Sequence, residues 1–365
     1  MIKLDGNYGE GGGSIARVAL ALSTITQKPF EVTDIRKGRA KPGLKNQHLF
    51  CVKALEELCS ARAEGAELGS TSLKYWPGEI KGSTISVDIE TAGSISLLLQ
   101  SLVIPAMFAD TKVRLKIKGG TCGLHAMPVE YFSNVLVPHI NKFAEKIEVN
   151  LEKRGYYPKG NGMVDIKIHP HYKLKEYADF NEFWQHLKQN APKISSTEQH
   201  NLIQIKGISH ASSDLQKAEV AERQAKAAKL LLNKLNCPIQ IQTEYSDTLS
   251  TGSGITLWAI FSKDPDDLDA ENPIILGADA LGERGKRSEQ VGQEAAEKLM
   301  QEINSKAPVD SHMADNLIPY LALFGGEIKV SKITNHTLTN IYVCEQFLGK
   351  IFEVDKEKNI IKTKT

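Results

Sequence analysis

The feature that most constrains the fold is an internal repeat with an offset of about 80 residues, too long for a solenoid unit. Residues 13–38 can be aligned with residues 93–120: both begin Gly-Ser-Ile, continue as an apolar helical segment and end in an alternating strand closed by glycine. A second helix candidate follows each copy, at 45–59 and at 128–147, and a shorter third copy covers 312–333. This order predicts split βαβ-type units whose helices pack on one side of their sheets.

The segment between the second and third copies has a different composition. Residues 172–200 are polar and aromatic, which predicts a loosely ordered connector. The expected elements after it are strands at Leu202–Lys206, Ile239–Glu244, Ile255–Phe261 and near Ile274, and helices at about Asp214–Leu235 and Glu289–Ile303. We therefore predict an α/β (α+β) fold with a repeated core at 1–180 and 306–365 and an inserted small α/β domain at 181–305.

Charge and cysteine content exclude several classes of protein. The formal net charge is +1, so a nucleic-acid contact must come from a local patch and not from a global field. The five cysteines are scattered without a C-x-x-C pair, which indicates reduced thiols and neither a zinc site nor a disulfide framework. No apolar run approaches the ~18 residues of a membrane helix, and no signal-peptide pattern is present. These features predict a cytoplasmic protein with no membrane partner.

The run GEGGGSIAR at 9–17 has the composition of a phosphate-binding loop. Glycines allow a close approach of backbone N–H groups to an anion, and the helix expected from about Ser14 adds the positive end of its dipole. Glu10 would repel a phosphate unless a divalent cation bridges the two groups, whereas Arg17 adds a positive charge one turn into the helix. The alternative is a plain strand–helix turn.

A basic segment, IRKGRAKPGLKNQH at 35–48, follows one strand later. Its arginines lie on a segment broken by glycine and proline, from which they can reach phosphates bidentately. Gln47 and His48 open the next helix, where polar side chains could contact a base or a sugar. The alternative is an ordinary solvated surface.

Three further glycine-rich segments have weaker signals. RGYYPKGNG at 154–162 is either a tight β-turn or a ligand contact. GERGKRS at 282–288 lacks the spacing of a P-loop, so we reject that interpretation. GGGSIA at 11–16 matches G-x-G-x-x-A, but the preceding strand is very short, so a dinucleotide-binding fold is only weakly indicated.

His336 lies between a strand ending near Ile333 and a helix expected from near Thr339. A histidine at such a boundary commonly caps the helix. The positive end of a helix dipole also disfavours imidazolium and leaves a ring nitrogen free to attack an electrophilic phosphate.

Taken together, these segments resemble the RNA 3′-terminal phosphate cyclase family over nearly the whole chain. The segments that carry the resemblance are GEGGGSIAR, RAKPGLKNQH, TAGSISLLLQ at 91–100, RGYYPKGNG, SHMADNL at 311–317 and NHTLTN at 335–340. The resemblance implies a core of three repeated βαβαββ-like units with a small thioredoxin-like insert. Enolpyruvyl transferases such as EPSP synthase share this core, so the fold alone does not decide the function.

The resemblance also implies a reaction. Members convert an RNA 3′-phosphate into a 2′,3′-cyclic phosphodiester, using ATP through a covalent histidyl-AMP and an RNA(3′)pp(5′)A intermediate and releasing pyrophosphate and AMP. The adenylylated histidine corresponds to His336, and Glu10 corresponds to the carboxylate associated with Mg²⁺ or Mn²⁺. The positions matching the nucleotide and phosphate pocket are Glu10, Gly11, Gly12, Gly13, Arg17, Arg36, Arg39, Gln47, Gln100, Pro128, Tyr131, His312, Asp315 and Asn316.

Two positions depart from the family pattern. Asn161 stands where a third glycine is common, and an asparagine tolerates the left-handed conformation. Asn316 stands where glutamine is common, which puts one side-chain contact in doubt. RNA is expected to be held at its end, through the basic segment and the 154–159 segment.

Three alternatives remain at this stage. The first is a non-catalytic cyclase-like protein of ribosome biogenesis, which would lack the histidine. The second is an enolpyruvyl transferase, which needs no ATP, and the third is a metal-independent module that binds RNA ends. The sequence leaves open the physiological RNAs, the preferred metal, the role of the insert and a base for the 2′-OH. It also leaves open the oligomeric state, including whether the protein forms a homo-oligomer.

Overall fold

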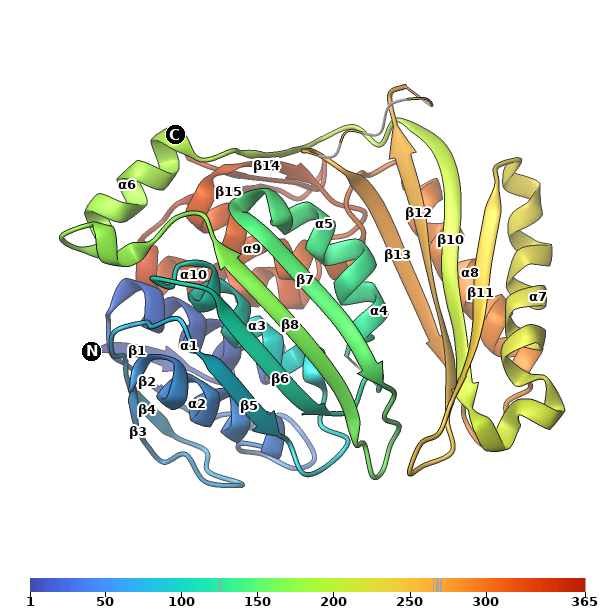
Figure 1. Ribbon diagram of the computed structural model, residues 1–365. Helices are drawn as coiled ribbons and strands as arrows, with labels where there is room; N and C mark the ends of the chain where they lie inside the picture. The colour runs from blue at the N-terminus through green and yellow to red at the C-terminus, as the bar shows by residue number, and fades with distance from the viewer. Residues whose placement is uncertain (125, 265, 267–268, 270, 365) are drawn as a thin grey trace.

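Three four-stranded sheets share one connectivity in the computed structural model, which describes residues 1–124, 126–264, 266, 269 and 271–364 (Figure 1). In each sheet the order is first, second, fourth, third strand. The first two strands are parallel, and the fourth is antiparallel to both the second and the third. Helices connect the first strand to the second and the second to the third, so each sheet with its helices forms one βαβαββ unit.

Each unit contains six or more helices and strands. The first comprises β1 (Ile2–Asp5), α1 (Ser14–Thr26), β2 (Phe30–Thr33), α2 (Asn46–Cys59), β3 (Arg62–Glu64) and β4 (Leu73–Trp76). The second comprises β5 (Thr84–Asp88), α3 (Ile95–Met107), β6 (Val113–Gly119), α4 (Val129–Tyr131), η1 (Phe132–Leu136), α5 (Val137–Ile140), η2 (Asn141–Phe143), β7 (Ala144–Lys153) and β8 (Gly162–Pro170). The third comprises β9 (Ile194–Ser196), α9 (Ser311–Phe324), β14 (Gly326–Lys329), α10 (Asn335–Leu348), β15 (Phe352–Asp355) and β16 (Ile360–Thr363), and η3 (Leu174–Glu176) and α6 (Phe180–Asn190) connect it to the second.

The helices of the three units meet in the middle of the core. All residues of α1 are buried, as expected for a helix that is apolar around its whole circumference. α1 packs against both α3 and α10, and α10 packs against α9. The strands show the alternation of sheets with one face on a core: along β6, every second residue is buried. Residues of all three units therefore contribute to one hydrophobic cluster.

The insert forms a separate sheet between β9 and α9 of the third unit, at the right of Figure 1. Its elements are β10 (Asn201–Ser212), η4 (Ser213–Ala218), α7 (Val220–Leu232), η5 (Asn233–Leu235), β11 (Ile239–Ser246), β12 (Ser253–Ser262), β13 (Ile274–Leu281) and α8 (Ser288–Asn304). The strand order is β11-β10-β12-β13, and α7 and α8 pack on this sheet over a hydrophobic cluster of its own.

The predicted α/β class is confirmed. The two copies recognised first in the sequence each cover one helix and one strand, α1 with β2 and α3 with β6. The likeness of the insert to thioredoxin and of the core to enolpyruvyl transferases stays a prediction, as do the domain boundaries at residues 181 and 305. The helix expected over 128–147 is shorter: its helical run ends at Phe143, and β7 begins at Ala144.

The expectation of a loosely ordered connector over 172–200 was wrong. α6 has an apolar stripe of Phe180, Phe183 and Leu187 that is buried against the core. β9 pairs in parallel with β14 and completes the third sheet. The polar composition obscured both elements, because α6 buries one face only and β9 has three residues.

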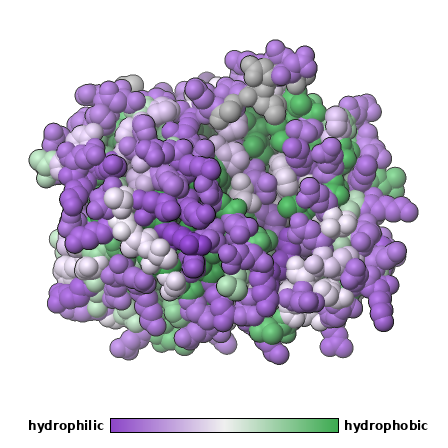
Figure 2. Space-filling model, in the orientation of Figure 1, coloured by the Kyte–Doolittle hydropathy of each residue, from purple (hydrophilic) through white to green (hydrophobic). Residues whose placement is uncertain are grey.

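Hydrophilic side chains cover most of the face seen in Figure 2. Within the described residues, no helix combines the length and the apolar character needed to cross a membrane.

Candidate functional site

Glu10 lies between a histidine and an arginine that come from distant parts of the chain. Its Oε1 accepts a hydrogen bond from Nη2 of Arg39 at 2.8 Å, and its Oε2 lies 2.5 Å from Nε2 of His336. The glycine loop reaches α10 because Gly9 has no side chain: with φ at +62°, a Cβ there would lie 2.4 Å from Oγ1 of Thr339. The loop, the basic segment and the 335–340 segment thus form one site, as their shared residue chemistry predicts.

His336 is in the first turn of α10, which begins at Asn335 and not near Thr339 as expected. Thr334 is the N-cap, and its Oγ1 accepts a hydrogen bond from the backbone N–H of Thr337 at 3.1 Å. A threonine before an apolar helical run is a start signal, so the sequence contained the correct boundary. The consequence is that His336 lies within the positive end of the helix dipole.

Asp315 fixes this end of α10 to α9. Its Oδ1 accepts hydrogen bonds from the hydroxyls of Thr334 at 2.8 Å and Thr337 at 2.7 Å, and its backbone oxygen accepts one from Asn340 at 2.8 Å. Burial raises the pKa of Asp315, although these threonine hydroxyls and the nearby His336 act in the opposite direction. Asp315 therefore positions the helix that carries His336, and sequence reasoning missed the two threonines that it binds.

The ionisation states of Glu10 and His336 depend on each other. The Glu10 contact raises the pKa of His336 above its ordinary value, against the effect of partial burial. Burial opposes ionisation of Glu10, but His336 and Arg39 together hold the pKa of Glu10 below its ordinary value. The contact with Glu10 therefore acts against the preference for a neutral imidazole that is expected from the helix dipole.

We expect His336 to titrate above the ordinary histidine pKa in the free protein, and above its value in Glu10→Gln. Because the folded-state pKa is raised, the stabilisation from this pair is present below the unfolded pKa and is lost as the pH rises through the folded pKa. Any reaction that needs the neutral ring will accelerate over the same rise in pH. A ¹H–¹⁵N NMR titration of the imidazoles, assigned with His336→Asn, measures this pKa. Equal His336 pKa values in wild type and Glu10→Gln would contradict the pairing.

Arg17 is buried and held by residues of the other two units. Its Nε donates to Oε1 of Gln100 at 2.8 Å, and Nε2 of Gln100 donates to Oδ1 of Asn316 at 2.9 Å. Nδ2 of Asn316 in turn donates to the backbone oxygen of His312 at 2.8 Å. Burial lowers the pKa of Arg17 to about 10, so the guanidinium stays protonated at neutral pH. The shorter Asn316, which departs from the family pattern, thus joins this network through Gln100.

His48, in the first turn of α2, is buried. Its Nδ1 accepts from the backbone N–H of Lys45 at 3.0 Å and so caps the helix, while Nε2 lies 3.3 Å from Nη1 of Arg17. Burial and the cations Arg17, Arg36 and Lys45 hold the pKa of His48 well below its ordinary value. A neutral His48 that accepts at Nδ1 carries its proton on Nε2, so it contacts Arg17 without accepting a hydrogen bond from it.

We expect Gln100→Leu to lower the free energy of unfolding by about 1–3 kcal/mol, because the buried Arg17 guanidinium loses its acceptor. Urea unfolding followed by circular dichroism measures the change. Gln301→Leu, on the exposed side of α8, is the matched control and should change stability by no more than about 0.5 kcal/mol. Equal midpoints for the two variants would show that the network does not stabilise the protein.

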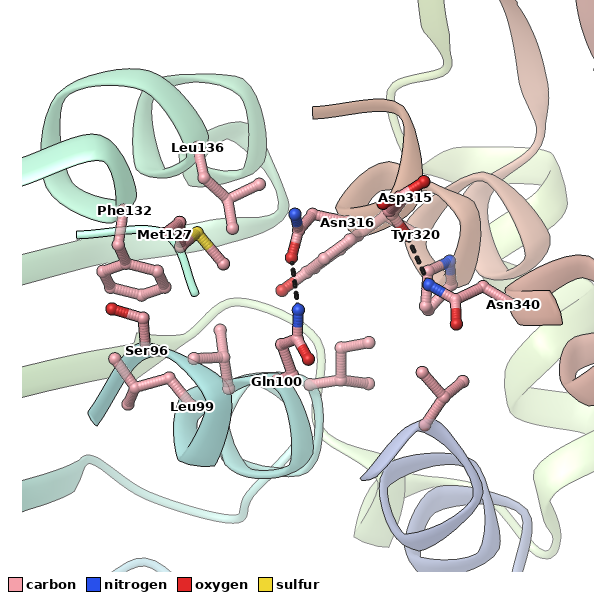
Figure 3. A pocket seen from close by; sticks show the side chains of 14 residues that line it. Ser96, Leu99, Gln100, Met127, Phe132, Leu136, Asp315, Asn316, Tyr320 and Asn340 are labelled. Atoms are coloured by element: carbon pink, nitrogen blue, oxygen red, sulfur yellow. Dashed lines mark hydrogen bonds between the residues drawn. The ribbon is translucent and has the colours of Figure 1, made fainter. Parts of the chain in front are cut away.

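A pocket lies where α3, α9 and α10 converge (Figure 3). Gln100 of α3 and Asn316 of α9 meet across it, and Asp315 and Asn340 form its other polar edge. The apolar wall of the pocket consists of Leu99, Met127, Phe132 and Leu136. The pocket thus combines an apolar wall from the second unit with polar side chains from both the second and the third unit.

The remaining predicted site residues are placed as follows. The Arg36 guanidinium is buried and donates to the backbone oxygens of Lys41 and Gly43 at 2.7 and 2.9 Å, so in this conformation it supports its own loop. Gln47 lies against Gly93, the start of the second repeat copy. Gly11, Gly12 and Gly13 continue the loop from Glu10 into α1, and an added Cβ at Gly12 would clash with Glu10 itself.

Tyr131, His312 and Pro128 are neighbours on the α4–α9 side. The ring of Tyr131 packs edge-on against His312, with ring centroids 6.4 Å apart. Tyr131 is fully buried, and its hydroxyl donates to Asp310 at 2.6 Å, so its side chain has no surface for a nucleotide in this conformation. Pro128, the N-cap of α4, is buried as well. Of these three predicted contacts, only His312 is exposed.

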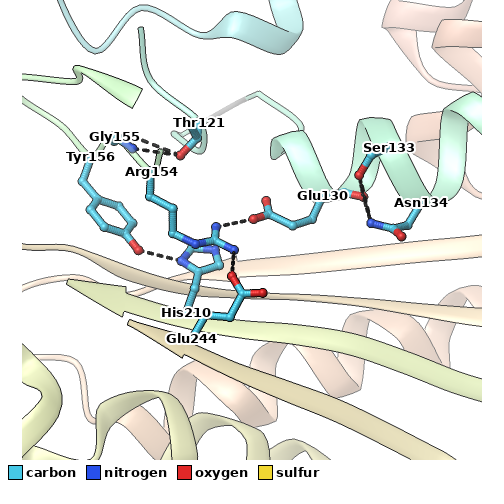
Figure 4. Close-up of polar contacts among 9 residues, drawn as sticks. All are labelled: Thr121, Glu130, Ser133, Asn134, Arg154, Gly155, Tyr156, His210 and Glu244. Atoms are coloured by element: carbon cyan, nitrogen blue, oxygen red, sulfur yellow. Dashed lines mark hydrogen bonds and ion pairs between the residues drawn. The ribbon is translucent and has the colours of Figure 1, made fainter. Parts of the chain in front are cut away.

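The 154–162 segment contacts the insert, as Figure 4 shows. Arg154 is buried and forms ion pairs with Glu130 of α4 and, at 2.7 Å, with Glu244 of β11. The hydroxyl of Tyr156 lies 2.8 Å from Nδ1 of His210 of β10. Arg154 is therefore occupied by carboxylates and does not provide the phosphate contact expected from this segment. The tolerance expected of Asn161 is confirmed: it adopts φ +65°.

The comparisons with known proteins all point to one family. Residues 8–354 match the family model described as RNA 3′-terminal phosphate cyclase. The chain is 44% identical over 354 residues to a protein of that name from Pyrococcus furiosus, covering 97% of this chain and 95% of the relative. Proteins of the same name from Saccharolobus solfataricus and Methanosarcina acetivorans are 42% and 41% identical, covering 98% and 99% of this chain and 97% and 99% of the relatives.

Proposed function

The chain belongs to the RNA 3′-terminal phosphate cyclase family, and we propose that it is an enzyme that converts an RNA 3′-terminal phosphate into a 2′,3′-cyclic phosphodiester with consumption of ATP. The observation that carries the proposal is the position of His336. It lies in the first turn of α10, in contact with Glu10, which also binds Arg39. A nucleophile, an acidic group and cations thus face one another at a glycine loop.

In the first step, Nε2 of His336 attacks the α-phosphorus of ATP. An N–P bond forms, the bond from the α-phosphorus to pyrophosphate breaks, and pyrophosphate leaves. The ring must be neutral to attack, so the proton that Glu10 favours on His336 has to leave first. Since Nε2 points at Glu10 in the free protein, entry of the phosphates between the two side chains separates the pair.

The residues at this site fit a divalent cation that takes most of its ligands from the substrate. Mg²⁺ is commonly bound by one or two carboxylates together with phosphates and water. Glu10 supplies one carboxylate, and no group of three or more His, Cys, Asp or Glu side chains suited to a metal occurs among the described residues. Glu10 would hold Mg²⁺ or Mn²⁺, and the ion would neutralise charge on the leaving pyrophosphate.

The cations around Glu10 have separate tasks in this proposal. Arg39 has a half-exposed side chain and can turn from Glu10 to a phosphate. Arg17 is fixed by Gln100 beside the glycine loop and adds a positive charge that cannot move away. The nucleoside of ATP would extend toward His312, the exposed member of the α4–α9 group.

The later steps transfer AMP to the RNA and close the ring. The RNA 3′-phosphate attacks the phosphorus of histidyl-AMP, the N–P bond breaks, and RNA(3′)pp(5′)A results. The adjacent 2′-OH then attacks the terminal RNA phosphorus and expels AMP. This last step is intramolecular and gains effective molarities of about 10⁵–10⁸ M, so it makes the smallest demand on protein side chains.

Incubation with α-³²P-labelled ATP and Mg²⁺ or Mn²⁺ tests the proposal. We expect acid-labile label on the denatured protein that can be chased onto a 3′-phosphorylated RNA and not onto a 3′-hydroxyl RNA. Failure of folded wild-type protein to take up label would refute the covalent mechanism. The non-catalytic alternative would then be preferred, provided that the protein still binds RNA ends.

A further inference from the structure

The loop between β7 and β8 is anchored on both sides. On one side, Gly160 adopts φ +65° and packs so closely on the 91–92 backbone that an added Cβ would lie 2.6 Å from the oxygen of Thr91. On the other side, the backbone N–H of Lys159 donates to Oγ of Ser250 in the insert at 3.1 Å. Together with the Arg154 ion pairs and the contact of Tyr156 with His210, these bonds fix the loop between the core and the insert (Figure 4).

This anchored loop presents one large side chain to solvent. Tyr157 is 80% exposed, more than any other large hydrophobic side chain of the described residues. Its neighbour in sequence, Tyr156, is 3% exposed, so the loop buries one ring and exposes the other. An exposed aromatic side chain on a rigid loop loses little conformational freedom when a flat ligand stacks on it.

The loop is also connected to the proposed active site by a continuous series of contacts. Gln47, in the first turn of α2, lies against Gly93, and the same 91–93 segment supports Gly160. Gln47 is followed by His48, which contacts the buried Arg17. The loop that carries Tyr157 is thus tied through the 91–93 segment to the residues around Arg17.

We propose that Tyr157 stacks on a nucleobase of the RNA substrate, upstream of the 3′-terminal phosphate; this inference rests on the proposed function. Base stacking on an aromatic ring does not depend on sequence and needs no large positive field, in agreement with a net charge of +1. Lys159, exposed two residues away, provides a cation for the neighbouring phosphate. The insert thus contributes indirectly, because β10, β11 and the Ser250 loop anchor the loop that carries the ring.

The experiment compares Tyr157→Ala and Tyr157→Phe with wild type in AMP transfer from pre-adenylylated protein to 3′-phosphorylated RNA. The substrates are a mononucleoside 3′-phosphate and oligonucleotides of increasing length, each with a 3′-phosphate. For wild type, we expect the RNA KM to fall at the length that first reaches the ring. For Tyr157→Ala, the fall disappears, and the KM for longer RNA rises about 5- to 100-fold, the loss expected for one stacked base.

Two controls separate stacking from other effects. Tyr157→Phe keeps the ring and should keep the wild-type KM, whereas Leu230→Ala removes a side chain that is 74% exposed on α7 and should change nothing. Formation of histidyl-AMP from ATP alone should be the same in all variants. A loss of length dependence equal in the Phe and Ala variants, or an unchanged KM in Tyr157→Ala, would overturn the inference.

Failure of this inference is distinct from failure of the proposed function. If wild type forms no histidyl-AMP, the proposed function fails, and fluorescence anisotropy with labelled 3′-phosphorylated RNA still measures the effect of Tyr157→Ala on binding. If histidyl-AMP forms but the variants bind and use RNA as wild type does, only the stacking proposal fails.

Discussion

His336→Ala is expected to take up no label from α-³²P-labelled ATP and to lose cyclase activity by a factor on the order of 10⁴ or more. The nucleophile is the one group whose removal leaves no covalent route, and loss of a nucleophile has effects of this order in enzymes that form covalent intermediates. His336→Asn, which is closer in shape and can keep a hydrogen bond to Glu10, should be equally inactive. Acid-labile label after denaturation is the measurement.

His312→Ala is the matched control for this prediction. His312 also lies in the first turn of its helix, on α9, but its ring packs on Tyr131 and has no contact with Glu10 among the described residues. This variant should still take up label, with a raised KM for ATP. If it lost the label and His336→Ala kept it, the nucleophile would be His312 and the roles assigned to Glu10 and α10 would be wrong.

Arg154→Ala should lower the free energy of unfolding by about 3–5 kcal/mol, the second large effect that we expect. The side chains of Arg154 and Glu130 are each 3% exposed, so removing the guanidinium leaves the Glu130 carboxylate buried without a cation. Thermal or urea unfolding measures the change. Arg223→Ala is the control, because its partner Glu289 and Arg223 itself are both about 40% exposed, at 42% and 41%, and such pairs contribute about 1 kcal/mol or less.

A second variant shows which interaction accounts for the stability that is lost in Arg154→Ala. Arg154→Met combined with Glu130→Leu removes both charges and should recover most of the stability, because an apolar pair of similar volume needs no desolvation of charge. If the double variant were as unstable as Arg154→Ala, the cost would come from lost packing at this junction. Equal stability of wild type and Arg154→Ala would show that the buried Arg154–Glu130 pair does not stabilise the protein.

Much of the core could be predicted because its signals are local. The segments that begin Gly-Ser-Ile predict helices that the structure places at α1 and α3, and the long helix of the insert appears as α7 with short helical turns at its ends. Where a signal was weak or misread, the prediction was wrong. β9 has three residues and is stabilised by pairing with β14, which lies more than a hundred residues away in the chain. The start of α10 was misplaced because the cap residue Thr334 was overlooked.

In the candidate site, too, some features could be predicted from the sequence and others could not. Residue chemistry pointed to Glu10, His336 and the arginines as candidates, and the resemblance to the cyclase family implied their roles. Residue chemistry could not separate side chains that face a ligand from those that support them. Arg36, Tyr131 and Arg154 carry suitable groups, yet backbone carbonyls, Asp310 and two carboxylates occupy them.

The sequence by itself determined the α/β class, the family, and the choice of Glu10, Arg17 and His336 as candidate site residues, because residue type, periodicity and motif order are properties of the chain. Only the tertiary structure decided the protonation preference of His336, the support of Arg17 by Gln100, and the exposure of Tyr157. The physical reason is that pKa, hydrogen-bond partners and solvent exposure depend on which atoms surround a side chain. Those atoms come from different units that only folding brings together.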